Sequence, residues 1–152
     1  METVAYEPES TVEGGIFCCE LPTDPAHLRS MRRMVREWAA NGGIHQDRLD
    51  DLVFAVDEAA SRGIRHSMSG RGPIWIDGHV ALGQVRVVVT DYGSHPASAD
   101  SDGLDLHMLG TLTDHMHVEE SDGATVITMV WDVSRIGLLG TRDSSRCTGR
   151  VA

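Results

Sequence analysis

Two side chains of opposite charge, Glu58 and Arg62, stand four residues apart near the end of a predicted helix. This spacing puts both on one helix face, and a glutamate that precedes an arginine can form an ion pair worth about 0.2–0.5 kcal/mol when exposed. We interpret the two residues first as such a pair on the helix surface. The alternative is that Arg62 contacts a phosphate group directly, since its guanidinium carries five donors and a permanent charge.

Three further segments contain residue types suited to ligand binding. Asp91-Tyr92-Gly93 ends a predicted strand, Asp102-Gly103-Leu104-Asp105-Leu106 closes a long polar stretch, and Gly123-Ala124-Thr125-Val126 opens the last predicted strand. Each also has a purely structural interpretation: a turn after a strand, a solvated acidic loop, and a hairpin turn followed by a core strand. Taken singly, each segment is compatible with either interpretation.

In their order along the chain, the four segments resemble the N, G1, G2 and G3 boxes of the GHKL ATP-binding fold. Within that fold, the sequence is most similar to the anti-sigma factor serine kinases of the RsbW/SpoIIAB type, over most of residues 16–133. The resemblance implies ATP or ADP as ligand, with Glu58 activating the attacking hydroxyl and Asp91 accepting a hydrogen bond from the adenine amino group. It also implies nucleotide contacts at four other positions, Gly93, Gly103, Leu104 and Thr125.

Two departures from the family pattern fall on its catalytic parts. Where the family has an asparagine whose amide oxygen holds Mg²⁺, this chain has Arg62, which has no acceptor atom. In the G2 box, two family glycines belong to a lid that wraps the phosphates. One of these two glycines is replaced here, by Ser101 or Asp105 depending on the alignment. Carboxylates at the end of the lid would repel a triphosphate unless a metal intervened. The implied Mg²⁺ therefore lacks its usual amide ligand, and we assign no residue as a metal ligand.

Three functional hypotheses follow. The first is an anti-sigma-factor-like regulator that, as the resemblance implies, binds a sigma factor or a STAS anti-anti-sigma protein, with an impaired or lost ATP and Mg²⁺ site. The second is an active MgATP-dependent protein-serine kinase that phosphorylates a STAS protein, with Glu58 as base. The third is an unrelated scaffold or ligand sensor whose former nucleotide cleft is filled by side chains. The resemblance also implies a homodimer.

The elements that must position these residues form one domain. We predict flexible tails over residues 1–13 and 136–152, the first of them acidic, and a folded GHKL-like domain over residues 14–135. The order of helical and alternating patterns predicts an α+β fold, in which helices pack on one face of a mixed or antiparallel sheet as a two-layer sandwich.

Periodicity and turn residues place the individual elements. Apolar residues at helical spacing predict a helix that begins near Pro25 and stops at Asn41, and a second helix over residues 46–66. A short helix is predicted over residues 104–112, and glycines predict a turn over residues 78–83.

The composition excludes several kinds of function. All 13 basic residues are arginine, so no lysine can serve a Walker A loop or a Schiff base. A net charge of −10 disfavours direct nucleic-acid binding. We expect neither a signal peptide nor a membrane span, because residues 1–15 have no basic and apolar pattern and no apolar run approaches ~20 residues. The three cysteines form no disulfide framework and are weak nucleophile candidates. We therefore expect a cytoplasmic protein.

Overall fold

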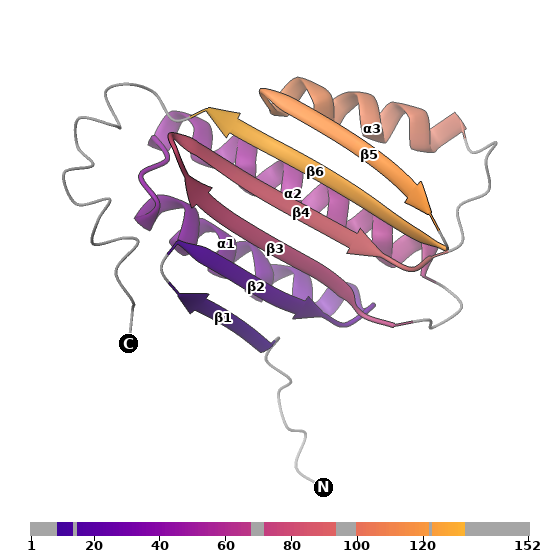
Figure 1. Cartoon of the computed structure of the whole chain (residues 1–152). Helices are drawn as coiled ribbons and strands as arrows, with labels where there is room; N and C mark the ends of the chain where they lie inside the picture. The colour runs from indigo at the N-terminus through magenta and orange to yellow at the C-terminus, as the bar shows by residue number, and fades with distance from the viewer. Residues whose placement is uncertain (1–8, 14, 68–71, 94–99, 122, 133–152) are drawn as a thin grey trace, which may run out of the picture.

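Six strands form one sheet in the order β1-β2-β3-β4-β6-β5, with every neighbouring pair antiparallel. The computed structural model describes residues 9–13, 15–67, 72–93, 100–121 and 123–132. The α-helices lie behind the sheet in Figure 1, on one of its faces. This arrangement confirms the predicted α+β class, a two-layer sandwich with its helices on one side.

The elements have the following bounds. The strands are β1 (Glu9–Glu13), β2 (Ile16–Leu21), β3 (Ile74–Ala81), β4 (Gln84–Asp91), β5 (His115–Ser121) and β6 (Ala124–Asp132). The helices are the 3-10 turn η1 (Pro25–His27), α1 (Leu28–Asn41), α2 (Gln46–His66) and α3 (Asp100–Leu112). Both long helices agree with the sequence prediction.

Helix α1 is positioned by a cap before its start and by a tryptophan near its end. Oδ1 of Asp24 accepts a hydrogen bond from the Ala26 amide at 2.9 Å, which fixes the turn that leads into α1. The Trp38 ring lies on Gly78 of β3, where a Cβ atom would come within 2.5 Å of the ring. The predicted turn over residues 78–83 is therefore wrong in its first half, because Gly78 is a strand residue that makes room for the indole.

Helix α2 contacts both the sheet and the other helices. Its buried side is rich in small residues, which let the helix backbone approach its neighbours closely. These residues are Ala55, Ala59, Ala60 and Gly63. Among the described helices, none has both the length and the apolar character needed to span a bilayer.

The core lies between the helices and one face of the sheet. Alternate residues of β4 and β6 are each at most 1% exposed, namely Val85, Val87, Val89, Thr125, Ile127, Met129 and Trp131. This period of two shows that β4 and β6 each turn one face toward the core.

Two segments differ from the predicted elements. Residues 9–13, expected in a flexible tail, form β1 and pair with β2, so the tail prediction is wrong there. The helix predicted from Leu104 begins at Asp100, because aspartate and serine suit the first turn of a helix. The predicted C-terminal tail lies outside the described residues, and the domain limits of 14 and 135 remain a prediction.

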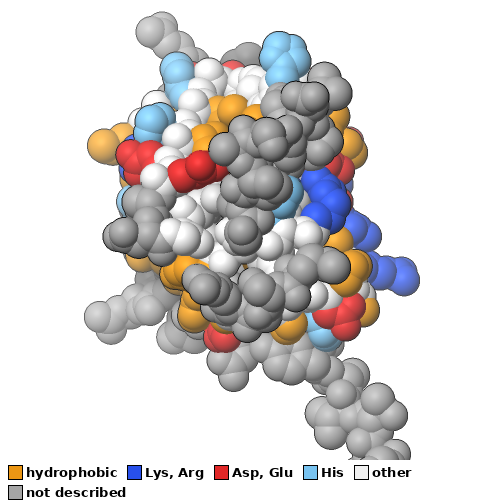
Figure 2. Space-filling view, turned by 90° about the vertical axis from the view of Figure 1, so that its right-hand side faces the viewer, with side chains coloured by type: hydrophobic (Ala, Val, Ile, Leu, Met, Phe, Trp, Pro, Cys, Tyr) orange, Lys and Arg blue, Asp and Glu red, His pale blue; other side chains and the backbone are white. Residues whose placement is uncertain are grey.

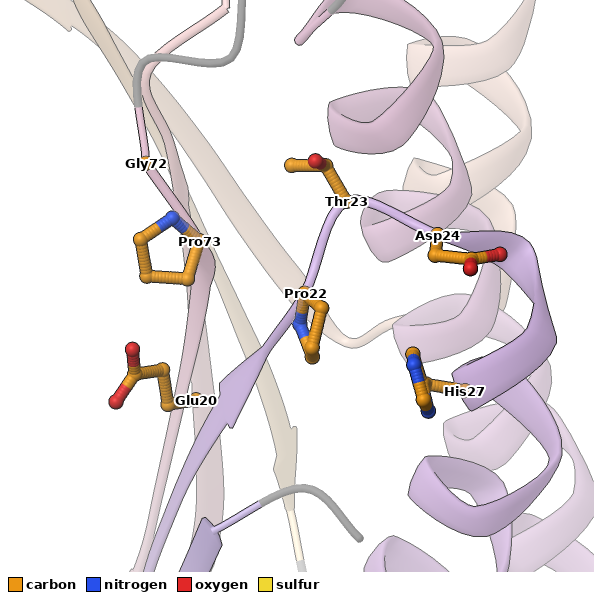
Figure 3. A pocket seen from close by; sticks show the side chains of 7 residues that line it. All are labelled: Glu20, Pro22, Thr23, Asp24, His27, Gly72 and Pro73. Carbon is orange, nitrogen blue, oxygen red and sulfur yellow. The ribbon is translucent and has the colours of Figure 1, made fainter. Parts of the chain in front are cut away.

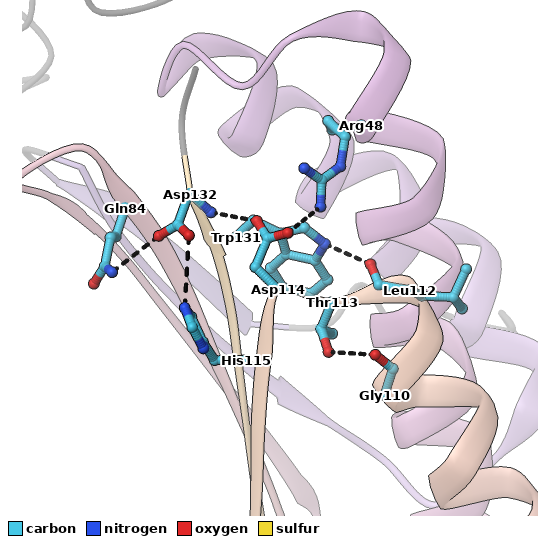
Figure 4. A network of polar contacts seen from close by, with 9 residues as sticks. All are labelled: Arg48, Gln84, Gly110, Leu112, Thr113, Asp114, His115, Trp131 and Asp132. Carbon is cyan, nitrogen blue, oxygen red and sulfur yellow. Dashed lines mark hydrogen bonds and ion pairs between the residues drawn. The ribbon is translucent and has the colours of Figure 1, made fainter. Parts of the chain in front are cut away.

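A network of polar contacts fastens the end of the sandwich at which β4 begins (Figure 4). Arg48 of α2 donates a hydrogen bond to Asp114 Oδ1 at 3.0 Å, and Asp114 Oδ2 accepts one from the Asp132 amide at 2.6 Å. Nε1 of Trp131 donates to the Leu112 carbonyl at 2.8 Å. These contacts join α2, the end of α3, and the edge of the sheet formed by β5 and β6.

We expect Asp114→Asn to lower the free energy of unfolding at pH 7 by about 1 kcal/mol, because it removes the charge and replaces one of the two acceptor oxygens by an NH₂ donor. Burial alone would raise the pKa of the Asp114 carboxyl, but the Asp132 amide, the hydrogen bond and charge of Arg48, and the charge of His115 lower it below the ordinary value of 3.8. A lowered pKa stabilises the fold above the pKa of the unfolded chain, and this contribution is lost as the pH falls through the folded-state pKa.

Urea unfolding of the wild type and the variant between pH 7 and about pH 3 measures this effect, and the difference should shrink in acid. Asp50→Asn is the control, since its ion pair with Arg36 is exposed and worth less than about 0.5 kcal/mol. A difference that stays constant with pH would contradict the assignment.

The β3–β4 hairpin turn consists of Leu82 and Gly83, both with positive φ, at 53° and 75°. Leu82 is fully exposed, and its left-handed conformation costs roughly 1 kcal/mol. We expect Leu82→Asn to raise the free energy of unfolding by about 0.5–1 kcal/mol, because Asn-Gly suits this turn. Thermal unfolding measures it, with Leu82→Ala as the control that should leave stability unchanged. An unchanged Tm for the asparagine variant would refute this prediction.

Candidate functional site

The buried polar and charged side chains of the described residues are few, and they gather at the end of β4. They are Arg62 and Ser67 at the end of α2, Asp91 at the end of β4, and Thr125 at the start of β6. Three of the four were predicted as site residues from the sequence. Because burying polar groups opposes folding, this concentration marks the place as a candidate ligand site.

Asp91 and Thr125 are neighbours across two strands. They are direct partners in the antiparallel register of β4 and β6, and their exposed fractions are 0% and 1%. Oδ1 of Asp91 accepts a hydrogen bond from the Gly93 amide at 3.1 Å. The structure therefore brings the predicted G1 residues, Asp91 and Gly93, together with the G3 residue Thr125.

Two glycines let the end of α2 touch the end of β4. A Cβ on Gly63 would lie 3.0 Å from Cβ of Asp91, and a Cβ on Gly93 would overlap the His66 carbonyl group. Ser67 Oγ donates a hydrogen bond to the Gly63 carbonyl at 2.6 Å, which ties down the last turn of the helix. We had assigned no role to Gly63, although a glycine inside a helical pattern costs about 1 kcal/mol and often marks a close approach of another element.

Arg62 is 2% exposed, so the interpretation of Glu58 and Arg62 as an exposed ion pair on the helix surface is wrong. The reason is that α2 packs against α3 as well as against the sheet, so the helix face expected to meet solvent is covered. Glu58, one turn earlier, is partly exposed. A buried guanidinium is costly unless anionic or polar groups compensate it, so its position constrains what this end of α2 can bind.

The lid residues are only partly described. Gly103 and Leu104 lie in the first two turns of α3, and the side chains of residues 100–105 and all of residues 94–99 lie outside the description. Leu109, further along α3, is fully buried and belongs to the core. The second half of α3 is therefore part of the packed domain.

At the position to which the resemblance assigns the Mg²⁺-binding amide, this chain has Arg62. No three His, Cys, Asp or Glu side chains in the described ranges come together as a metal site, and arginine has no acceptor with which to replace an amide. His115 and His117 of β5 instead lie near carboxylates, at 3.5 Å from Asp132 and 3.1 Å from Glu119.

A shallow pocket of about 510 Å³ opens beside the start of α1 (Figure 3). It is lined by Glu20, Pro22, Thr23, Asp24, His27, Gly72 and Pro73. None of the predicted nucleotide-site residues lines it. This pocket is therefore separate from the candidate nucleotide site.

The two described cysteines are poor nucleophiles. Burial, and then the charge of Glu20, raise the pKa of Cys19 to about 11. Burial, and then the hydrogen bond and charge of Asp77, raise the pKa of Cys18. Both thiols are protonated at neutral pH, which excludes thiolate chemistry there.

We expect Gly93→Ala to lower the free energy of unfolding by about 1–3 kcal/mol, because the added methyl must push β4 away from the end of α2. Gly110→Ala in α3 is the matched control: the nearest atom to its Cβ would be 3.8 Å away, so this change should stabilise by up to about 1 kcal/mol. Urea unfolding compares them, and equal effects of the two changes would contradict the packing argument.

Comparison with known proteins agrees with this geometry. The chain is 25% identical over 127 residues to the serine-protein kinase RsbW of Bacillus velezensis, and 26% identical over 127 residues to that of Bacillus subtilis. Each match spans 70% of this chain and 79% of the relative.

A solved structure of the RsbU and RsbW domains of Rv1364c from Mycobacterium tuberculosis has the same fold, with a TM-score of 0.66 and 22% identity. The match covers 78% of this chain and 32% of that one. Residues 21–131 match the family model described as the histidine kinase-like ATPase domain. This confirms the resemblance stated from the four boxes, and the chain belongs to the histidine kinase-like ATPase domain family.

Proposed function

We propose that this protein is an anti-sigma-factor-like regulator of the cytoplasm, which binds a sigma factor or a STAS anti-anti-sigma protein and has an impaired Mg²⁺-dependent ATP site. The observation that carries the proposal is the contrast within one site. At the end of the site proposed to hold the adenine, Asp91, Gly93 and Thr125 are in contact or in register. At the position where the family has its Mg²⁺-binding asparagine, this chain has the buried Arg62. Binding a partner needs the fold, whereas phosphoryl transfer also needs the metal.

The second candidate function is an active protein-serine kinase that phosphorylates a STAS protein. Its support is Glu58, which stands on α2 with partial exposure, and the printed name of the relatives, serine-protein kinase. In this role Glu58 would accept the proton of the attacking serine hydroxyl. Transfer of radioactive phosphate from ATP to a STAS protein would favour this function over the first.

The outer face of the helix layer offers a surface for an acidic partner. Arg32 and Arg36 of α1 are held by Asp57 and Asp50 of α2, at 3.1 and 2.8 Å. Figure 2 shows arginine side chains gathered along one side of the molecule. Part of the positive charge on this face is therefore neutralised within the protein.

Three exposed residues of α1 and α2 are proposed for a partner, and we call them the arginine surface: Arg29, Arg33 and Phe54. Arg29 and Arg33 are exposed, four residues apart, and form no ion pair with a described residue. Like charges at this spacing disfavour a helix, and in a chain of net charge −10 they would attract an acidic segment. Phe54 is 46% exposed and supplies the aromatic anchor typical of interfaces.

We expect the purified protein to bind at least one sigma factor or STAS protein of its host in biolayer interferometry. The double variant Arg29→Glu, Arg33→Glu should weaken that complex at least about tenfold, since it reverses two interface charges. Arg86→Glu, on the sheet face without helices, is the control that reverses one charge away from this surface, and it should change the affinity by less than about threefold. Failure to bind any such protein would overturn the proposed function.

We expect Asp91→Asn to weaken ADP binding at least about tenfold in calorimetric titration, because the amide removes the charge from an acceptor of the same size. Asp77→Asn on the exposed side of β3 is the control and should leave ADP affinity unchanged. Equal affinities for the wild type and Asp91→Asn would remove Asp91 from the nucleotide site. The proposed homodimer is tested separately, by sedimentation of the wild type.

A further inference from the structure

The sheet face without helices carries an aromatic and acidic surface at the end where β3 begins. We propose that this surface binds an arginine side chain carried by an extended segment of a partner protein. In this complex the guanidinium stacks on the Trp75 ring and pairs with the Glu20 carboxylate. The inference goes beyond the proposed function, because the arginine surface of the helix layer selects an acidic partner and this second surface selects a basic one.

The aromatic part of the surface is Trp75 of β3. Its ring is 38% exposed, although Ile74 and Ile76 on either side of it are fully buried, so the indole points away from the helices. No helix covers this face of the sheet in Figure 1. A large ring that stays in water on an uncovered face is available to a partner, and exposed tryptophan is the side chain that interfaces most favour as an anchor.

The register of the sheet places a carboxylate beside the indole. Glu20 of β2 is the direct antiparallel partner of Trp75, so the two Cβ atoms lie about 5 Å apart on the same face. Glu20 is partly exposed, and no hydrogen bond or ion pair joins its carboxylate to another described residue. The face of an aromatic ring attracts a cation, and a carboxylate next to it pairs with one. Together the two side chains select a positively charged group.

The shallow pocket beside this pair extends the surface. Pro22 and Pro73 supply apolar walls, and Asp24 adds a second carboxylate to the lining (Figure 3). A second aromatic ring borders the pocket, because a Cβ on the lining residue Gly72 would lie 3.9 Å from Cδ2 of Tyr92. Tyr92 is itself 37% exposed. The pocket therefore offers apolar contact to the aliphatic stem of a long side chain and acidic contact to its charged end.

These features fit arginine in a protein segment better than other cations. A guanidinium is planar, stacks on aromatic rings and donates hydrogen bonds to a carboxylate in its own plane, whereas an ammonium is a strongly hydrated point charge. A shallow pocket encloses too little of a small molecule to hold it, so residues on both sides of the arginine have to supply further contact. The net charge of −10 also attracts a basic segment during association.

NMR of the full-length chain, labelled with nitrogen-15, tests the inference. The probes are the peptide acetyl-Gly-Pro-Arg-Pro-Gly-amide and a control peptide with citrulline, which has nearly the same shape as arginine but no charge. The arginine peptide should shift the indole N–H signal of Trp75 in a saturable way and bind at least about fivefold more tightly than the citrulline peptide. Trp75→Phe identifies this signal, and the buried Trp38 and Trp131 should not shift.

Two variants separate the local carboxylate from general charge attraction. Glu20→Gln should weaken binding of the arginine peptide at least about threefold, because it removes the charge next to the indole. Glu37→Gln removes an exposed carboxylate of α1, so it makes the same change in net charge and should leave the affinity the same within about 1.5-fold.

Equal affinities for the two peptides, an unshifted Trp75 signal, or equal losses in Glu20→Gln and Glu37→Gln would each overturn the inference. None of these outcomes bears on the proposed regulator. Its own test is the binding of a sigma factor or STAS protein, and the loss of that complex when the charges of the arginine surface are reversed.

Discussion

The contact between the end of α2 and the end of β4 is the constraint on which the candidate site depends. Gly63 packs on Asp91, and Gly93 packs on the His66 carbonyl. The two backbones can meet because neither glycine has a side chain that would separate them. The contact fixes the height of α2 above the sheet and, through Ser67, the end of its last turn. A larger residue at either glycine would shift Asp91 relative to Arg62.

This fixed contact also sets the positions of the charged and polar side chains of the site. Among the described residues, buried polarity is limited to Arg62, Ser67, Asp91 and Thr125, which lie on three elements that meet at one end of the sandwich. A negative and a positive side chain are thus held at set positions before any ligand arrives. Such preorganisation favours binding, because the protein need not reorganise to meet the ligand. It favours catalysis only if the same groups also face the position at which charge develops in the transition state.

Much of this fold could be predicted from local sequence. Helical spacing predicts the bounds of α2, because this signal depends on neighbouring residues alone. Alternating apolar residues mark the inward faces of β4 and β6 in the same local way. The four boxes also led to Asp91, Gly93 and Thr125. What failed depended on distant contacts: Gly78 looked like a turn because the Trp38 ring above it is 40 residues earlier. Arg62 was interpreted as exposed for the same reason, since α3, which packs against α2, begins 38 residues later.

The edges of the sheet have a consequence for how the protein can assemble. The outermost strands are β1, which begins and ends with glutamate, and β5, whose His115, His117, Glu119 and Glu120 are exposed. Unpaired strand edges invite the addition of further strands, and charged residues along them oppose it. This molecule is thus protected against growth into fibrils by edge-to-edge pairing. The two broad faces and the loop ends are therefore the surfaces that these edge charges leave for complexes.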